Sequence, residues 1–162
     1  MNEPPVPSDA QAGVIPPEAL RTLSGLDILR GLRDGTLPPP PMGRLLGFGL
    51  EEVEEGRVVF AAVPGGQHYN PIGTVHGGFA ATLLDSCMAC AVQSTLARGF
   101  GYTTLELKVN LVRAMTEDTG PVRAEGRVLH AGRRVATAEG RLTDAAGRLL
   151  AHGTTTCLVI EF

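Results

Sequence analysis

The chain has 162 residues, of which 43% are hydrophobic and 19% charged, and its formal net charge is −3. A chain of this size and composition is expected to form one globular domain with a sizeable core, which excludes a disordered protein. The slightly acidic balance, without a dense block of Lys and Arg, argues against a nucleic-acid-binding or anionic-membrane surface.

The N-terminal segment and the cysteines bear on the cellular compartment. Residues 1–17 are rich in proline and small polar residues, which predicts a loose tail, and they lack the pattern of a signal peptide. The odd set Cys87, Cys90 and Cys157 does not suggest a disulfide framework. No apolar run is long enough for a membrane span. We therefore expect a cytoplasmic protein without membrane association.

The next segment predicts a short accessory helix. Ser24 and Asp27 match a capping box, and leucines recur after them at helical spacing. Residues 37–47, LPPPPMGRLLG, are typical of a stiff, extended connector. We therefore divide the chain into residues 1–36, a flexible tail with an accessory helix, and residues 37–162, the main domain.

The main domain is predicted to hold one buried helix and one antiparallel sheet. Residues 49–63 alternate as a strand or hairpin does, whereas residues 77–97 are apolar nearly all round, which is typical of a buried helix. The period then changes to two in residues 103–113. Three more strands are expected at residues 121–130, 134–143 and 149–160. The pattern predicts an α+β fold in which the sheet wraps the helix.

The start of the predicted buried helix has a chemical signature. Gly77 and Gly78 fall in its first turn, where backbone N–H groups lack intrahelical partners and the helix dipole adds positive potential. Without side chains, the two glycines let another group approach these donors closely. Such a turn can bind an anion or a carbonyl oxygen that gains charge. Close packing of helix against sheet would also explain the glycines.

Asp85 is the one charged residue between positions 77 and 97. A carboxylate in apolar surroundings suits a general base or a nucleophile, although an Asp that caps backbone or pairs with a distant Arg would fit too. On one helix, Gly77 and Asp85 stand about 12 Å apart along the axis. One small reacting group cannot touch both. If Gly77 polarises a carbonyl and Asp85 attacks that carbonyl or directs water to it, the two residues must come from different chains. This predicts a homodimer with two shared sites.

The stretch YNPIGTVHGGFAATLLD, residues 69–85, resembles the active-site signature of hotdog-fold acyl-CoA thioesterases of the PaaI-like, phenylacetate-degradation subgroup. The resemblance extends from about residue 37 to the C-terminus. It implies the hotdog fold, a long helix wrapped by a curved antiparallel sheet. It also implies homodimers, commonly paired into tetramers, and an acyl-CoA substrate with an aromatic or medium-chain acyl group. It implies no metal and no organic cofactor, since coenzyme A is part of the substrate.

The resemblance also assigns roles within this stretch. Gly77 is the backbone donor to the thioester carbonyl, with His76 and Gly78 in the same turn. Asp85 is the nucleophile or the general base. Asn70 matches an Asn, seven residues before the Gly, that helps to hold the attacking water or the thioester.

Residues after the helix receive roles from the same resemblance. In some members a Ser or Thr hydroxyl at the start of the next strand positions water. Counting back from Glu-Leu-Lys favours Thr104, whereas the alternation of the leucines favours Thr103 on the helix side. Arg113, Arg133 and Arg134 occupy places where family members carry basic residues, which predicts contacts with the phosphates of coenzyme A. Solvent exposure alone would also explain these arginines.

Two alternative functions remain open on the same fold. Residues 70–73, NPIG, are similar to part of the Asp-x-Asn-Pro-x-His pattern of hotdog enoyl-CoA hydratases and dehydratases, but Gly73 stands where that pattern has its His. A non-catalytic acyl-CoA-binding hotdog protein is the other alternative. It would be expected to lack the acid, and Asp85 is present.

Overall fold

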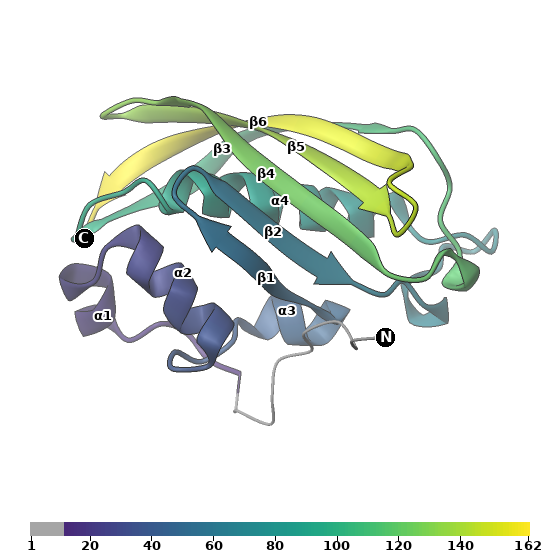
Figure 1. Cartoon of the computed structure of the whole chain (residues 1–162), viewed down its shortest axis with the longest axis horizontal. Helices are drawn as coiled ribbons and strands as arrows, with labels where there is room; N and C mark the ends of the chain where they lie inside the picture. The colour runs from purple at the N-terminus through teal and green to yellow at the C-terminus, as the bar shows by residue number, and fades with distance from the viewer. Residues whose placement is uncertain (1–11) are drawn as a thin grey trace.

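A long helix and one curved sheet dominate the computed structural model, which describes residues 12–162 (Figure 1). The helix is α4 (Gly77–Gln93). The strands are β1 (Phe48–Glu54), β2 (Arg57–Ala62), β3 (Phe100–Leu111), β4 (Val122–Ala131), β5 (Val135–Asp144) and β6 (Leu149–Glu161). They form one antiparallel sheet in the order β1-β2-β4-β5-β6-β3. The predicted hotdog fold is confirmed.

A row of glycines lets α4 lie close to the sheet. Gly126 of β4, Gly140 of β5 and Gly153 of β6 are paired side by side across three strands. A Cβ on Gly126 would lie 2.3 Å from the carbonyl oxygen of Cys87, and one on Gly140 would lie 2.7 Å from Cγ of Met88. These distances are too short for a side chain, so the glycines set the helix-to-sheet spacing. The helix residues above them are fully buried.

The predicted elements of the main domain match the structure closely. The segment at residues 49–63 is the β1–β2 hairpin, and β4, β5 and β6 begin and end within one residue of their predicted bounds. The helix predicted over residues 77–97 ends at Gln93. The strand predicted over residues 103–113 is β3, which begins three residues earlier.

The extended connector predicted at residues 37–47 is wrong in its second half. Helix α3 (Pro41–Leu46) begins there, with Pro40 at its N-cap and left-handed Gly47 at its end. Proline is favoured in the first turn because its missing N–H needs no partner there, so this run begins a helix. Helix α1 (Pro17–Thr22) was not predicted either and opens on a proline in the same way. Residues 1–11 of the predicted loose tail lie outside the described residues.

Helix α2 (Gly25–Asp34) is the predicted accessory helix, and its predicted cap is confirmed. Oγ of Ser24 accepts a hydrogen bond from the N–H of Asp27. The helix packs on β1 and on the C-terminal end of α4. Ile28 and Leu29 are each only 2% exposed, so α2 belongs to the core rather than to a loose appendage.

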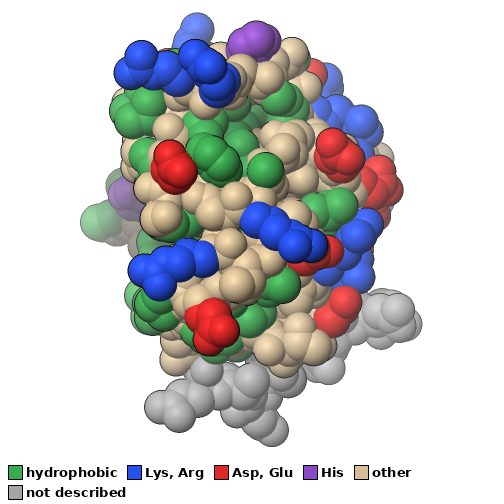
Figure 2. Space-filling view, turned by 90° about the vertical axis from the view of Figure 1, so that its left-hand side faces the viewer, with side chains coloured by type: hydrophobic (Ala, Val, Ile, Leu, Met, Phe, Trp, Pro, Cys, Tyr) green, Lys and Arg blue, Asp and Glu red, His purple; other side chains and the backbone are tan. Residues whose placement is uncertain are grey.

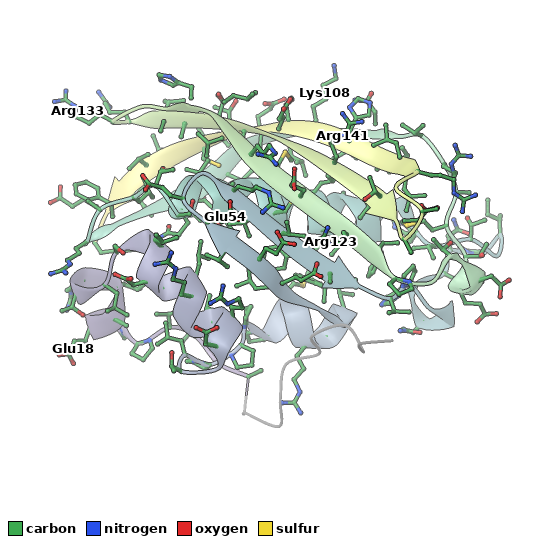
Figure 3. All side chains as sticks on the ribbon, viewed as in Figure 1. Glu18, Glu54, Lys108, Arg123, Arg133 and Arg141 are labelled. Carbon is green, nitrogen blue, oxygen red and sulfur yellow. The ribbon has the colours of Figure 1, made fainter. Side chains whose placement is uncertain are left out.

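The two edges of the sheet differ in what they expose. Within residues 12–162, strand β3 pairs only with β6, so no described strand covers its other edge, and it exposes Leu105 (58%) and Leu111 (60%). Near the β1 edge, by contrast, the outer face is charged: Arg123 pairs with Glu51 and Glu52, and Figure 3 labels Arg123 among outward side chains. No helix within residues 12–162 is both long enough and apolar enough to cross a bilayer.

Candidate active site

The first turn of α4 presents one free backbone donor. Nδ1 of His76, the N-cap residue, accepts a hydrogen bond of 2.8 Å from the N–H of Gly78. The N–H of Gly77 has no hydrogen-bond partner among residues 12–162. The imidazole must therefore keep Nδ1 unprotonated, and the Gly77 N–H is the donor left for a ligand at this helix N-terminus.

A side chain at position 77 would contact the end of β3. A Cβ there would lie 2.6 Å from Cδ1 of Leu111, the last residue of β3. Leu111 is 60% exposed and lies against the backbone of Gly77. A side chain at position 77 would therefore displace the flexible end of Leu111, which would then lie differently over the Gly77 N–H.

The loop before α4 is held by Asn70. Its Oδ1 accepts hydrogen bonds from the N–H groups of Ile72 (3.0 Å) and Thr74 (3.3 Å). Its Nδ2 donates to Oγ1 of Thr74 at 2.9 Å. Asn70 thus shapes the turn that leads to Gly77, and its contact with water or thioester stays a prediction.

His68 is a supporting residue that sequence reasoning missed. Its ring stacks on Phe79 in the first turn of α4, with centroids 4.2 Å apart, and Nδ1 accepts from the N–H of Gly65 at 3.0 Å. Its carbonyl accepts from the N–H of His76 at 2.7 Å. Burial lowers the pKa of His68, so the ring is neutral at neutral pH and can keep this acceptor. No local pattern predicts such contacts, because they join segments that meet only in the folded chain.

Asp85 lies half-buried in the middle of α4 and contacts the neighbouring strand. Oγ1 of Thr104 in β3 donates a hydrogen bond of 3.0 Å to Oδ1 of Asp85. Thr103 is exposed. Between the two threonines that the sequence left open, Thr104 is the one whose hydroxyl reaches the acid.

A β-bulge reconciles the two ways of counting along β3. The register with β6 shifts between Thr104 and Glu106, which adds Leu105 as an extra residue. After the bulge, Val109 packs on the core and Leu111 lies over Gly77. The inward-pointing residues in this part of β3 are therefore those that the alternation of the leucines predicted. Before the bulge, the alternation of inward and outward side chains is shifted by one residue, so Thr104 also points inward.

Neutral groups surround Asp85 on the side toward the C-terminal end of α4. Sγ of Cys90 lies 4.0 Å from the hydroxyl of Tyr102 in β3. Burial raises the pKa of Cys90 to about 12, and interaction with Cys90, together with burial, raises the pKa of Tyr102. Neither group ionises at neutral pH.

The predicted arginines lie at opposite ends of the chain's sheet. Arg113 follows the end of β3, next to the start of α4. Arg133 and Arg134 form the β4–β5 turn, and the carbonyl of Arg134 accepts from Val159, at the level where β3 begins. Figure 3 labels Arg133 at that end, and Figure 2, which faces it, shows basic side chains gathered along its upper rim. One chain does not bring all three together.

Asp85 and Gly77 do not meet within one chain either. Both lie on α4, eight residues apart, which corresponds to about 12 Å along a continuous helix. The predicted site residues therefore fall into two separate groups within one chain. One holds Gly77, His76, Gly78, Asn70 and Arg113, and the other holds Asp85 and Thr104.

Comparison with known proteins shows the family of the chain. The family model described as the thioesterase superfamily matches residues 72–151, which include α4 and Asp85. A phenylacetic acid degradation-related protein of Ralstonia eutropha is 30% identical, with 80% of this chain and 98% of that chain covered and a TM-score of 0.73. No curated protein sequence matches the chain.

Two further solved structures share the fold. A hypothetical thioesterase of Streptococcus pneumoniae with coenzyme A is 25% identical, over 71% of this chain and 87% of that chain, with a TM-score of 0.64. The Escherichia coli PaaI protein of the phenylacetic acid degradation operon is 20% identical, over 75% of this chain and 86% of that chain, with a TM-score of 0.69. The chain therefore belongs to the thioesterase superfamily and is a thioester hydrolase with the hotdog fold of the PaaI-like group.

Proposed function

We propose that the protein hydrolyses an acyl-CoA with an aromatic or medium-chain acyl group to the free acid and coenzyme A, in a site that two subunits share. The observation that carries the proposal is the division of the site on α4. Its N-terminus offers an unpaired N–H at Gly77, and its middle holds Asp85 with Thr104. The coenzyme A bound to the Streptococcus pneumoniae relative supports the substrate class.

The chemistry follows from these two groups. Asp85 either takes a proton from a water molecule that attacks the thioester carbon or attacks that carbon itself to form an anhydride, which water then hydrolyses. Both routes place negative charge on the carbonyl oxygen, and the Gly77 N–H of the partner subunit donates to it. One such donor is worth about 10²–10³ in rate. Collapse of the tetrahedral intermediate breaks the C–S bond and releases coenzyme A as its thiolate.

The open edge of β3 supports the pairing of subunits. A twelve-residue edge strand with exposed leucines is a ready template for a second copy, and a symmetric pair would place two β3 strands antiparallel. The start of one β3 then lies beside the end of the other. In that arrangement Gly77, which lies under Leu111 at the end of β3, approaches the half-site of the partner that holds Asp85.

The same arrangement gives the arginines a common role. Arg113 lies near the end of β3, whereas Arg133 and Arg134 lie near the level at which β3 begins. An antiparallel pair brings the two ends toward each other. We propose that they bind the phosphates of coenzyme A, because guanidinium groups suit phosphate recognition.

A thiol-release assay across a panel of acyl-CoAs, with Asp85→Asn beside the wild type, tests the proposed reaction. We expect turnover of at least one aromatic or medium-chain acyl-CoA by the wild type. Asp85→Asn should lower kcat by at least about 10²-fold, because the amide can neither accept the proton nor attack. KM should change little, since the substituted side chain keeps its size.

Binding of a non-hydrolysable acyl-CoA thioether separates catalysis from binding in the same experiment. Calorimetry should give similar affinities for the wild type and Asp85→Asn. Unchanged kcat in the variant would remove Asp85 from the reaction. Tight binding with no turnover of any acyl-CoA by the wild type would favour the non-catalytic alternative.

A further inference from the structure

Leu111, the last residue of β3, has an exposed side chain whose end lies against Gly77. The Cβ position of Gly77 lies 2.6 Å from Cδ1 of Leu111 and 3.9 Å from its Cγ. Apart from the two chain neighbours of Gly77, no other side chain among residues 12–162 comes within 4 Å of that position. The leucine methyl group therefore contacts the backbone of Gly77. Gly77 is half-buried, although His76 and Gly78 on either side of it are exposed, which fits a cover supplied by Leu111.

The backbone on both sides of this leucine is held by β6. Leu111 itself pairs with Ala151. Immediately beyond it, the carbonyl of Leu150 accepts hydrogen bonds from the N–H groups of Val112 at 2.9 Å and Arg113 at 3.0 Å. The end of β3 is therefore fixed relative to the sheet, and the contact with Gly77 is part of the fold rather than a chance position of a loose side chain.

The methyl group of Leu111 borders the space into which the Gly77 N–H points. In an α-helix the backbone N–H groups point toward the N-terminus, and every Cα–Cβ bond is tilted in the same direction. The Cβ position that Leu111 approaches thus lies beside the N–H that has no partner among residues 12–162. A methyl group offers water no hydrogen bond, so it narrows the directions from which water can reach this donor.

We propose that Leu111 is the apolar wall of the oxyanion site: its terminal methyl groups keep water from the Gly77 N–H, which is then available to the thioester oxygen. The inference rests on the proposed function, in which this N–H binds the carbonyl oxygen as it gains charge. A donor from which water is excluded stabilises developing charge more strongly, because water neither screens the interaction nor competes for it. Leu111 itself transfers no proton and forms no bond.

Substitutions at Leu111 test the wall by kinetics. Leu111→Ala should lower kcat about three- to tenfold, a fraction of the roughly 10²–10³ that a whole oxyanion donor is worth. KM should change little, because the hydrogen bond strengthens only as charge develops in the transition state. Leu111→Met keeps an apolar side chain of similar volume and should retain most of the activity. Leu111→Asn keeps the approximate size but binds water, so it should lose as much as Leu111→Ala. Equal kcat for Leu111→Ala and the wild type would overturn the proposal.

Val112→Ala is the matched control. Val112 is the next residue along the chain and is 53% exposed, against 60% for Leu111, and none of its atoms lies within 4 Å of the Cβ position of Gly77. We expect its removal to leave kcat unchanged. A loss in Val112→Ala equal to that in Leu111→Ala would assign both losses to disturbed subunit pairing and would overturn the proposal. Sedimentation of every variant identifies a concentration at which all of them have the same assembly state.

Exchange of the Gly77 amide hydrogen with water gives a second readout that needs neither turnover nor pairing, because Leu111 and Gly77 belong to the same chain. Magnetisation transfer from water in NMR measures this rate for individual amides. We expect Leu111→Ala to raise the rate at Gly77 by at least about threefold, and Leu111→Met and Val112→Ala to leave it unchanged. An unchanged rate in Leu111→Ala would overturn the proposal. Faster exchange in a protein that hydrolyses no acyl-CoA would contradict the proposed reaction alone, so the two failures are distinguishable.

Discussion

His76 decides which of the two glycine amides is available to a ligand. By accepting the N–H of Gly78, its ring caps the helix and leaves the N–H of Gly77 without a partner in the described part of the chain. The histidine is exposed, and His68 fixes its backbone through a 2.7 Å hydrogen bond. In this structure the imidazole of His76 caps the helix and so leaves the N–H of Gly77 as the donor at its N-terminus within residues 12–162.

We expect His76→Ala to destabilise the protein by about 1 kcal/mol, the usual cost of losing an N-cap. Its kcat should fall about tenfold, because fraying of the first turn misplaces the Gly77 N–H. His76→Asn is the control, since the Asn side chain can accept from the same amide. Urea unfolding and thiol-release kinetics measure the two effects. Full activity in His76→Ala would show that the cap is dispensable for catalysis.

At the scale of secondary-structure elements, α2 is joined to α4 through backbone contact. A Cβ on Gly25, the first residue of α2, would lie 1.8 Å from the carbonyl oxygen of Gln93, the last residue of α4. The N–H of Gly25 also donates to the carbonyl of Leu96 at 3.0 Å. The accessory helix therefore closes the C-terminal end of the helix that carries the site.

Gly25→Ala should lower the free energy of unfolding by about 2–3 kcal/mol, because backbone atoms cannot move aside as a side chain can. Gly31→Ala is the matched control on the same helix. Its Cβ would meet the terminal carbon of Leu37 at 3.0 Å, and this flexible side chain can shift. We expect a change below about 1 kcal/mol there. Equal losses in urea unfolding would contradict the backbone contact.

The sequence predicted most elements of the fold because their periodicity depends on local burial. The apolar run around Asp85 and the alternation of the later strands follow from which side of each element faces the core. The bulge at Leu105 could not be predicted, since an added residue is visible only against the pairing strand. This is why the choice between Thr103 and Thr104 stayed open. The start of α3 at Pro41 was missed because a proline run fits an extended segment as well as a first helical turn.

The whole molecule is, on the proposed function, a pair of chains, and complementation tests this directly. Asp85→Asn chains keep Gly77, and Gly77→Val chains keep Asp85, so a mixed dimer carries one intact site and one doubly defective site. Each variant alone should be nearly inactive. Co-expressed at equal levels, the two should give about a quarter of wild-type activity, since half of the dimers are mixed and each has one intact site.

Two different affinity tags allow the mixed dimer to be purified, and it should then have about half of the wild-type specific activity. Inactivity of a dimer shown to contain both chains would contradict the shared site. Wild-type protein that is fully active as a monomer in sedimentation experiments would contradict it as well.

The continuity of α4 has a consequence for how two such sites would respond to substrate. On the proposed function, the N-terminus of α4 would supply the oxyanion donor of one reaction centre. The same rigid helix would carry the acid of the other centre two turns further along. A ligand that moves the first turn of α4 would also move Asp85, which acts in the neighbouring centre, so the two centres would be mechanically coupled. Saturation of a pair coupled in this way would depart from a simple hyperbola.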